Sequence, residues 1–421
     1  MAILRVMNSA KDVFTRYALV LITVWATDAQ ARRVVDATGH LKLFSTASFP
    51  APYADDVPGA LLAASGSSVV DSRLKLLWRP QRKLRIELHP TLTLTQGQAS
   101  VGLSTGVTRS GEELLPLSYA MVDDPALQLN ARLDRASLRW DVKRLRLTFG
   151  RQPITFGKGR VFTPLDLVSP FSPTTIDNSF KPGVDSIRLD WFRGMSGRIT
   201  LVAAYTGDPG PDFAEWRMDR STWAAHAKGS FGDNWELEGF SGWIYDEPVL
   251  GASVFYNGGF IGYYGDINIT LSDDDPFGRL VIGAQYKPTE KTYVTLEGYA
   301  QSLGADDPKA YLNQLSSVRY QRGELVQLGR FYMAVIGSYQ LAPLVTLSGA
   351  VLSNLTDPSI LLMPSVNWSA ANNASISMGG LAGFGARPSL VPGSGGTLQL
   401  QLSSEYGSIP VTAFIQGAFY F

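Results

Sequence analysis

The 421-residue chain has no cysteine, only three histidines and no excess of either charge. Without cysteine there is no disulfide framework, no cysteine-ligated zinc and no thiol nucleophile. His40, His89 and His226 are too scattered to predict a metal cluster. Lys+Arg and Asp+Glu count 37 each, whereas a nucleic-acid-binding protein normally shows a basic excess. After the first 31 residues no stretch approaches the ~18 apolar residues that a membrane-spanning helix needs.

Glycine and aromatic residues, by contrast, are abundant. The chain has 41 glycines, and aromatic residues make up 11% of it. A chain rich in glycine and aromatics, free of cysteine and without a membrane helix has the composition typical of a transmembrane β-barrel.

The N-terminus has the features of a secretory signal peptide. Arg5, Lys11 and Arg16 form a basic region, Tyr17 to Trp25 is a short apolar run, and Ala29-Gln30-Ala31 fits a cleavage site. An N-terminal anchor helix is the alternative, but the apolar run is short for one. We expect residues 1–31 to be a signal peptide and residues 32–421 to form one barrel domain.

The rest of the chain alternates apolar and polar residues with a period of two, which predicts β-strands. In residues 84–95, Leu84, Ile86 and Leu88 share one face while Arg85 and Glu87 share the other. A soluble β-sandwich also alternates. Its strands are shorter, however, since soluble strands usually have ~5–6 residues and a tilted membrane strand needs ~9–11. Aromatic residues near strand ends, as in the girdle of a membrane barrel, are Trp78, Trp140, Trp191, Trp235, Trp243 and Tyr286.

Short and long connections alternate along the chain, as periplasmic turns and extracellular loops do in a barrel. The fold class predicted is all-β, an eighteen-stranded antiparallel transmembrane β-barrel. The expected strands are 38–48, 68–79, 84–96, 131–142, 145–157, 184–192, 197–208, 222–231, 235–246, 250–256, 260–272, 278–286, 292–302, 329–340, 344–355, 360–370, 374–386 and 411–421. Residues 397–404 also alternate, and we assign them to the last external loop because a nineteenth strand would put the C-terminus outside.

Charged residues on several strands fall on the face that should line the lumen. These candidates for setting solute selectivity are Arg73, Lys75, Arg85, Glu87, Arg135, Arg139, Asp141, Arg146, Arg188 and Asp190. Fixed charge in a narrow pore biases which ions and solutes enter. A local arginine excess would favour anions. The alternative is that opposite charges pair across neighbouring strands and only stiffen the wall.

The segment after the fifth strand is rich in glycine and proline but too apolar to extend freely into water. We expect residues 158–182 to fold into the barrel as a constriction, with Lys158, Arg160, Phe162 and Asp166 as its candidate residues. A surface loop with its own apolar cluster is the alternative. Gly157-Lys158-Gly159 is not a phosphate-binding loop, because the required Gly-Lys-Ser/Thr is absent.

No enzyme is predicted, and no catalytic residue, metal ligand or cofactor-binding residue is assigned. An acyl-transfer site needs a serine and a histidine within hydrogen-bond reach and a group that orients the histidine. None of the three histidines lies beside a recognisable nucleophile motif.

Three blocks resemble a broad family of Gram-negative barrels that includes alginate-export-type porins. They are the Gly39-His-Leu-Lys-Leu strand, the block from Gly150-Arg-Gln through Gly157-Lys-Gly, Pro164-Leu-Asp and Pro170 to Gly183-Val-Asp, and the ending from Ser404-Glu-Tyr-Gly to Phe421. Strand count and length are also similar to those of barrels proposed to secrete polysaccharides in myxobacteria. The resemblance implies a polysaccharide-export channel in the outer membrane, working with a periplasmic polysaccharide-export protein.

A general or substrate-specific diffusion porin for small solutes is the alternative function, and a non-conducting structural barrel is a third. In each case the expected location is the Gram-negative outer membrane. The expected partners are membrane lipid, the barrel-assembly machinery and the cargo, with no nucleic acid.

Overall fold

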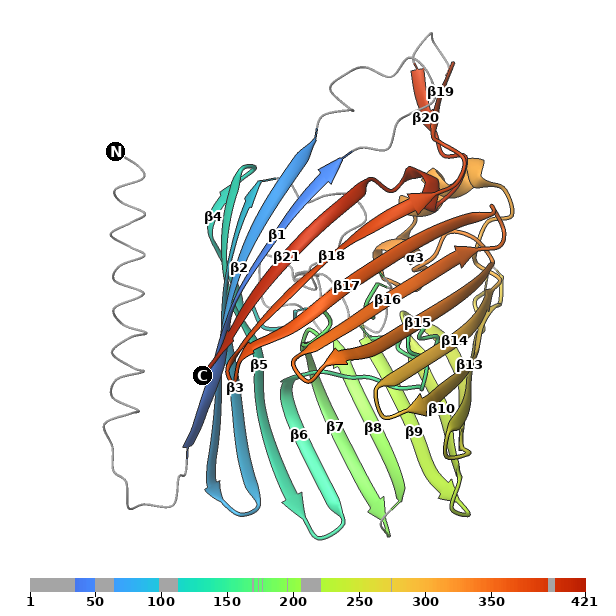
Figure 1. Cartoon of the computed structure of the whole chain (residues 1–421). Helices are drawn as coiled ribbons and strands as arrows, with labels where there is room; N and C mark the ends of the chain where they lie inside the picture. The colour runs from blue at the N-terminus through green and yellow to red at the C-terminus, as the bar shows by residue number, and fades with distance from the viewer. Residues whose placement is uncertain are drawn as a thin grey trace, which may run out of the picture.

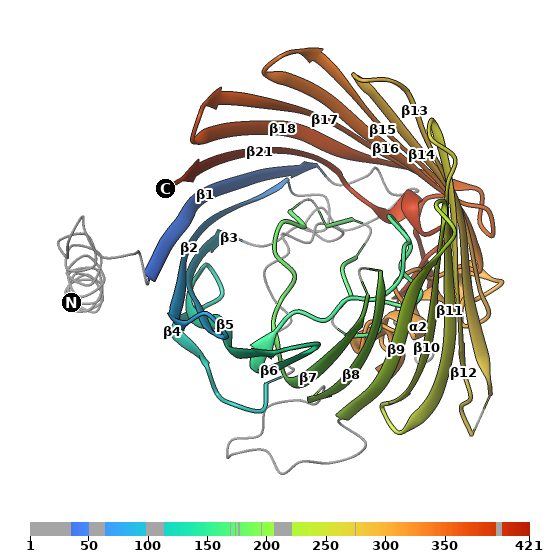
Figure 2. The same ribbon diagram turned by 90° about the horizontal axis from the view of Figure 1, so that it is seen from below.

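The computed structural model describes residues 35–49, 64–97, 113–168, 170–172, 174–175, 177–194, 196–205, 221–273, 275–392 and 398–421. The predicted signal peptide at residues 1–31 lies outside the described residues. Eighteen long antiparallel strands form one closed barrel (Figures 1 and 2). No helix in these ranges is long and apolar enough to cross a membrane.

The barrel strands follow one another around the ring in chain order. They are β1 (Val35–Phe49), β2 (Ser65–Gln81), β3 (Leu84–Gly97), β5 (Leu127–Val142), β6 (Leu145–Gln152), β7 (Val184–Arg193), β8 (Gly197–Tyr205), β9 (Ser221–Phe231), β10 (Trp235–Ile244), β11 (Glu247–Asn257), β12 (Ile261–Thr270), β13 (Phe277–Thr289), β14 (Thr292–Gln301), β15 (Phe331–Ala342), β16 (Val345–Asn354), β17 (Ser359–Ala371), β18 (Ala374–Phe384) and β21 (Val411–Tyr420).

The first and last strands close the ring. β1 pairs with β21 from His40 opposite Tyr420 to Phe49 opposite Val411. The backbone N–H of Gly39 also donates to the carbonyl of Phe421 at 2.8 Å. A closed ring leaves no strand edge unpaired, which is the condition for a β-sheet to stand in lipid.

Strand β12 shows why these residues form a barrel wall. Its burial alternates along its whole length, with Ile261, Tyr263 and Ile267 exposed on the outer face and Asp266 and Asn268 buried on the inner one. The predicted girdle aromatics are all exposed, from 39% for Trp191 to 52% for Trp140. An outer surface that is apolar between aromatic borders matches the hydrocarbon layer of a membrane.

All eighteen predicted strands are present, but three local expectations need correction. The strand expected over 145–157 ends at Gln152, because Gly150 has a φ of 106° and Pro153 has no N–H for the ladder. The connection expected at 97–130 contains an additional strand, β4 (Ser118–Asp124), which pairs with residues 127–132 of β5. The link expected near 247–250 is instead a turn at Tyr245 and Asp246.

Further elements lie in the long connections. Between β14 and β15 are η3 (Pro308–Ala310), α2 (Tyr311–Leu315) and α3 (Val318–Gln321). Between β18 and β21 are β19 (Ser389–Pro392), β20 (Leu398–Gln401) and η5 (Tyr406–Ser408). β20 pairs with β19 and not with the barrel, so within residues 398–404 there is no additional spanning strand, as expected; residue 397 lies outside the described residues.

Candidate functional site: the lumen and the segment that crosses it

The described part of residues 153–183, which join β6 to β7, crosses the interior of the barrel. Figure 2 shows the green trace inside the ring of strands. At one wall, backbone amides of this segment, which we call the crossing segment, bond to Asp266 on β12 and Glu297 on β14. At the other wall, Asp177 accepts from Lys42 on β1 at 2.5 Å and from Gln416 on β21 at 3.0 Å. One segment that contacts both walls restricts the open cross-section.

Apolar packing holds the crossing segment against the inner wall. Ile154, Phe156 and Leu165 belong to one buried cluster with Val202 on β8 and Phe240 on β10. Such burial stabilises by roughly 25 cal/mol per Å² of apolar surface. This packing explains why the inner faces of these strands carry apolar residues, which a water-filled lumen alone would not require.

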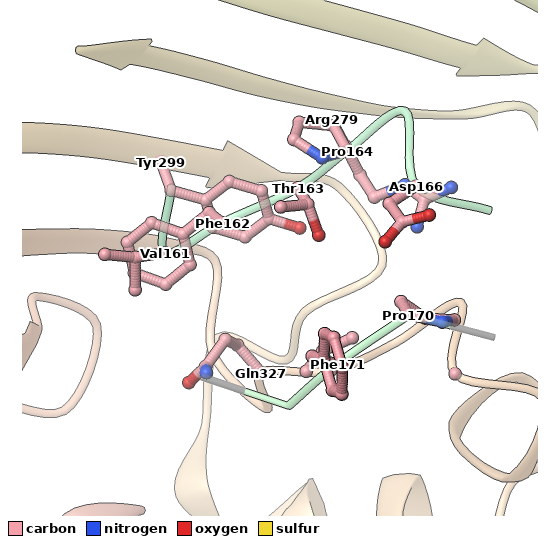
Figure 3. Close-up of a pocket in the computed structure, with 12 residues that line it drawn as sticks. Val161, Phe162, Thr163, Pro164, Asp166, Pro170, Phe171, Arg279, Tyr299 and Gln327 are labelled. Carbon is pink, nitrogen blue, oxygen red and sulfur yellow. The ribbon is translucent and has the colours of Figure 1, made fainter. Parts of the chain in front are cut away.

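Phe162 belongs to a second buried apolar cluster, which it forms with residues of β13 to β18. Its ring stacks on Tyr299 of β14 with centroids 4.7 Å apart, and Tyr332 of β15 lies 5.8 Å away. Beside it is a cavity of about 20 Å³ between the crossing segment, Arg279 and Gln327 (Figure 3). That volume holds about one water molecule, far less than the ~300 Å³ of a small ligand pocket, so this cavity is not a substrate site.

Glycines let the segment approach the wall. Gly157 has a φ of 90°, and a Cβ there would lie 2.7 Å from a carboxylate oxygen of Asp266. A Cβ on Gly159 would lie 1.9 Å from the carbonyl oxygen of Phe162. A side chain at Gly157 would push the backbone away from Asp266, and one at Gly159 would collide with the backbone of the segment itself. The Gly157-Lys158-Gly159 sequence therefore serves close backbone approach.

The four candidate constriction residues have different environments. Lys158 forms ion pairs with Glu236 and, at 3.0 Å, with Glu238 on β10. Asp166 pairs with Lys181 inside the segment and is buried, as is Phe162. Arg160 alone is exposed, and its side chain has no ion pair within the described ranges. Phe162 and Asp166 thus hold the segment in place, and Arg160 faces the water.

Most of the candidate lumen charges are paired. Arg73 bonds to Asp134 at 2.5 Å, Arg139 to Asp141 at 2.9 Å, and Arg188 to Asp190 at 3.0 Å. The remaining pairs are Arg146 with Asp141 at 2.7 Å, Arg135 with Asp134 at 3.9 Å and Glu87 with His89 at 3.1 Å. For these residues the wall-stiffening alternative describes the geometry well.

Lys75 and Arg85 differ from the others. Within the described ranges, neither side chain has an ion pair or a hydrogen bond. Lys75 lies over the ring of Phe180 at 4.4 Å, and its charged neighbours are Arg73, Lys42 and Arg135. Arg85 stands directly opposite Arg139 on β5. Lys75 therefore combines a free cation with further positive charge, whereas Arg85 is a free cation whose charged neighbours are of both signs, Arg139 and Arg79 with Glu87 and Asp141.

The carboxylates on β12 and β14, unlike Lys75 and Arg85, already have hydrogen-bond partners. Asp266 accepts from Lys158 N at 2.7 Å and Gly159 N at 2.9 Å, and Glu297 accepts from three further amides. Sequence patterns did not indicate this capping, because backbone N–H donors carry no residue signature. The lumen therefore presents unpaired cations on β2 and β3 and capped carboxylates on β12 and β14.

The three histidines do not form a nucleophile pair within the described part of the chain. Each Nε2 bonds to a carboxylate: His40 to Asp71, His89 to Glu87 and His226 to Glu238. Each Nδ1 is buried without a hydrogen-bond partner there. No serine hydroxyl is thus placed for activation by any of the three.

Comparison with known proteins identifies the fold. No family model matches the sequence, and no curated protein matches it either. Among solved structures, Pseudomonas aeruginosa OpdK with vanillate is similar at 11% identity and a TM-score of 0.53, over 92% of this chain and 98% of that one. A BenF-like porin from Pseudomonas fluorescens Pf-5 is 8% identical, with a TM-score of 0.55 and the same coverages. Acinetobacter baumannii OccAB2 is 9% identical, with a TM-score of 0.54, over 93% of this chain and 99% of that one. The chain thus has the eighteen-stranded antiparallel fold of outer-membrane channels.

Proposed function

We propose that the chain is an outer-membrane diffusion channel for small solutes with a preference for anions. The observation that carries this proposal is the unpaired state of Lys75 and Arg85 in a lumen whose carboxylates are capped or paired. Fixed positive charge at a constriction raises the local concentration of anions and repels cations.

Similarity to solved structures supports small solutes over a polymer. One similar structure contains vanillate, which is a small carboxylate, and another is named a porin. The crossing segment also lies in the path that a polysaccharide chain would take. The polysaccharide-export function and its periplasmic partner, implied by the family resemblance, find no support in these matches, so the alternative function is the better one.

Reversal potentials in planar bilayers with a potassium chloride gradient test the proposal. The double variant Lys75→Gln with Arg85→Gln should lower the anion-to-cation permeability ratio by about two- to threefold, because two free lumen charges are lost. The matched control is Arg82→Gln with Lys287→Gln, which removes the same charge from the turn after β2 and from the exposed end of β13. Its ratio should equal that of the wild type. An unchanged ratio in the lumen variant would refute the anion preference.

A further inference from the structure

We propose that Asp266 and Glu297 are positioning residues that fix the width of the passage by holding the backbone of the crossing segment. This inference rests on the proposed function, since it assumes a passage. It also makes the constriction a fixed element of the barrel and not a mobile gate.

Five successive amides converge on these two carboxylates. Asp266 Oδ2 accepts from the N–H groups of Lys158 and Gly159. Glu297 Oε1 accepts from Arg160 N at 2.6 Å, and Glu297 Oε2 accepts from Val161 N and Phe162 N at 3.0 Å each. Hydrogen bonds to an ionised acceptor are about twice as strong as neutral ones. The wall thus holds the turn that brings the segment furthest across the barrel.

Neighbouring wall residues orient both carboxylates. Ser253 on β11 donates to Asp266 Oδ1 at 2.6 Å, and Tyr264 on β12 donates to Glu297 Oε1 at 2.5 Å. Each acceptor is therefore held in place before the segment binds. The residues come from β11, β12 and β14 of one continuous sheet, so the geometry is set by the rigid sheet and not by the segment itself.

Both carboxylates are buried and have no cation beside them in the described part of the chain, so they depend on the backbone amides as hydrogen-bond donors. Asp266 and Glu297 are 1% and 0% exposed, and within the described ranges neither forms an ion pair with a lysine or arginine. A buried carboxylate without donors is strongly unfavourable. Withdrawing the segment would leave two such groups in the wall, so the segment and the wall stabilise each other.

The side-chain anchor of the same turn is weaker. Lys158 and Glu236 are 22% and 25% exposed, and ion pairs open to water contribute little. The second partner of Lys158, the buried Glu238, is shared with His226. We therefore assign the positioning role to the amide caps and not to the lysine.

The test compares the double variant Asp266→Asn with Glu297→Gln against the wild type. Each substituted side chain loses its charge and turns an N–H group toward backbone donors. We expect single-channel conductance to rise at least twofold and liposome-swelling assays to show entry of larger sugars. The matched control, Asp233→Asn with Glu290→Gln, removes the same charge from exposed turns and should behave as the wild type.

An altered ion preference with unchanged conductance and unchanged sugar size limit would overturn the proposal, because charge loss alone explains it. Folding is checked by heat-modifiable mobility on gels, where a closed barrel migrates differently from the unfolded chain. If the double variant does not assemble, each single variant is measured, and each should show a smaller rise in conductance. Wild-type conductance in both singles would also overturn the proposal.

A second readout is independent of conduction. The chain has no native cysteine, so Val161→Cys gives one thiol on the crossing segment, at a position that is partly buried against the wall. Its reaction with a polyethylene-glycol maleimide should be at least tenfold faster when the two carboxylates are replaced, and equal rates would reject the positioning role. A wild-type barrel that passes no solute at all would reject the proposed function and leave this labelling result to decide the positioning role.

Discussion

Glu405 lies in the long connection between β18 and β21, where three segments of the chain meet. The protonation of its side chain should decide how stable the contacts among these segments are. Its carboxylate accepts from Leu328 N at 3.2 Å, Tyr332 OH at 2.5 Å and Asn354 Nδ2 at 2.8 Å. Its own N–H donates to Asp357 at 2.7 Å. No lysine or arginine pairs with it within the described ranges. Burial, and then the neighbouring Asp357 carboxylate, raises the pKa of Glu405 to about 7.

Whether the stability of these contacts rises or falls with pH follows from the direction of this pKa change. We call the arrangement closed when the contacts of Glu405 are formed and open when they are broken. Because the pKa of Glu405 rises from 4.5 to about 7 in the closed arrangement, the carboxyl holds its proton better there than in the open one. The closed arrangement is therefore favoured at low pH and loses stability as the pH rises through 7. The full difference is up to about 3.4 kcal/mol, at 1.36 kcal/mol per pKa unit. Between pH 5.5 and 8.5 about 2 kcal/mol of it is lost, an increase in opening of about 30-fold.

Hydrogen exchange followed by mass spectrometry measures this opening. After correction for the intrinsic exchange rate at each pH, residues 311–328, 354–359 and 402–409 should lose protection together between pH 5.5 and 8.5. Glu405→Gln should abolish the pH dependence, while Glu290→Gln in an exposed turn should retain it. Equal protection of the wild type at both pH values, or a pH dependence that survives in Glu405→Gln, would refute the reasoning.

Two further predictions concern assembly and stability. Ile282→Arg places a charge on an outward side chain that is 63% exposed in the middle of β13. It should cost about 2–4 kcal/mol and lower the folded yield in liposomes on heat-modified gels, whereas Ile282→Leu should fold like the wild type. Arg151→Met removes a buried guanidinium that pairs with Asp185 at 2.9 Å and Glu113 at 3.2 Å. Leaving these buried carboxylates unpaired should cost about 3–5 kcal/mol; an unchanged urea midpoint would contradict this, and adding Asp185→Asn should recover part of the loss.

The barrel could be predicted from the sequence because the membrane constrains every strand in the same way. Lipid on one face and water or packed protein on the other impose a period of two over a length that soluble strands rarely reach. The strand from Leu84 onward shows this signal most clearly, and its start is correct to the residue. Strand ends were less predictable where backbone geometry decides them, as at Gly150 and Pro153.

That the crossing segment packs inside the protein was predictable, but the wall residues that bind it were not. Its apolar residues and glycines indicate a segment that packs against other parts of the protein. Glu297 lies on the buried inner face of β14, and its partners are main-chain amides of residues 160–162. Every residue except proline carries such a donor, so no pattern of side chains reveals which amides will be used.

The pairing of lumen charges, in contrast, has a sequence signal in the spacing of two. Residues i and i+2 share a face of a strand ~7 Å apart, close enough for Arg139 to reach Asp141 and for Arg188 to reach Asp190. Lys75 has no carboxylate at either such position. Arg85 has Glu87, but that carboxylate pairs with His89 on its other side. The charges left to act on a solute are therefore those that remain after neighbours on the same face have paired. Among the ten candidate lumen residues, pairing along one strand and pairing between strands, as in Arg73 with Asp134 and Arg146 with Asp141, together leave Lys75 and Arg85 unpaired in the described part of the chain.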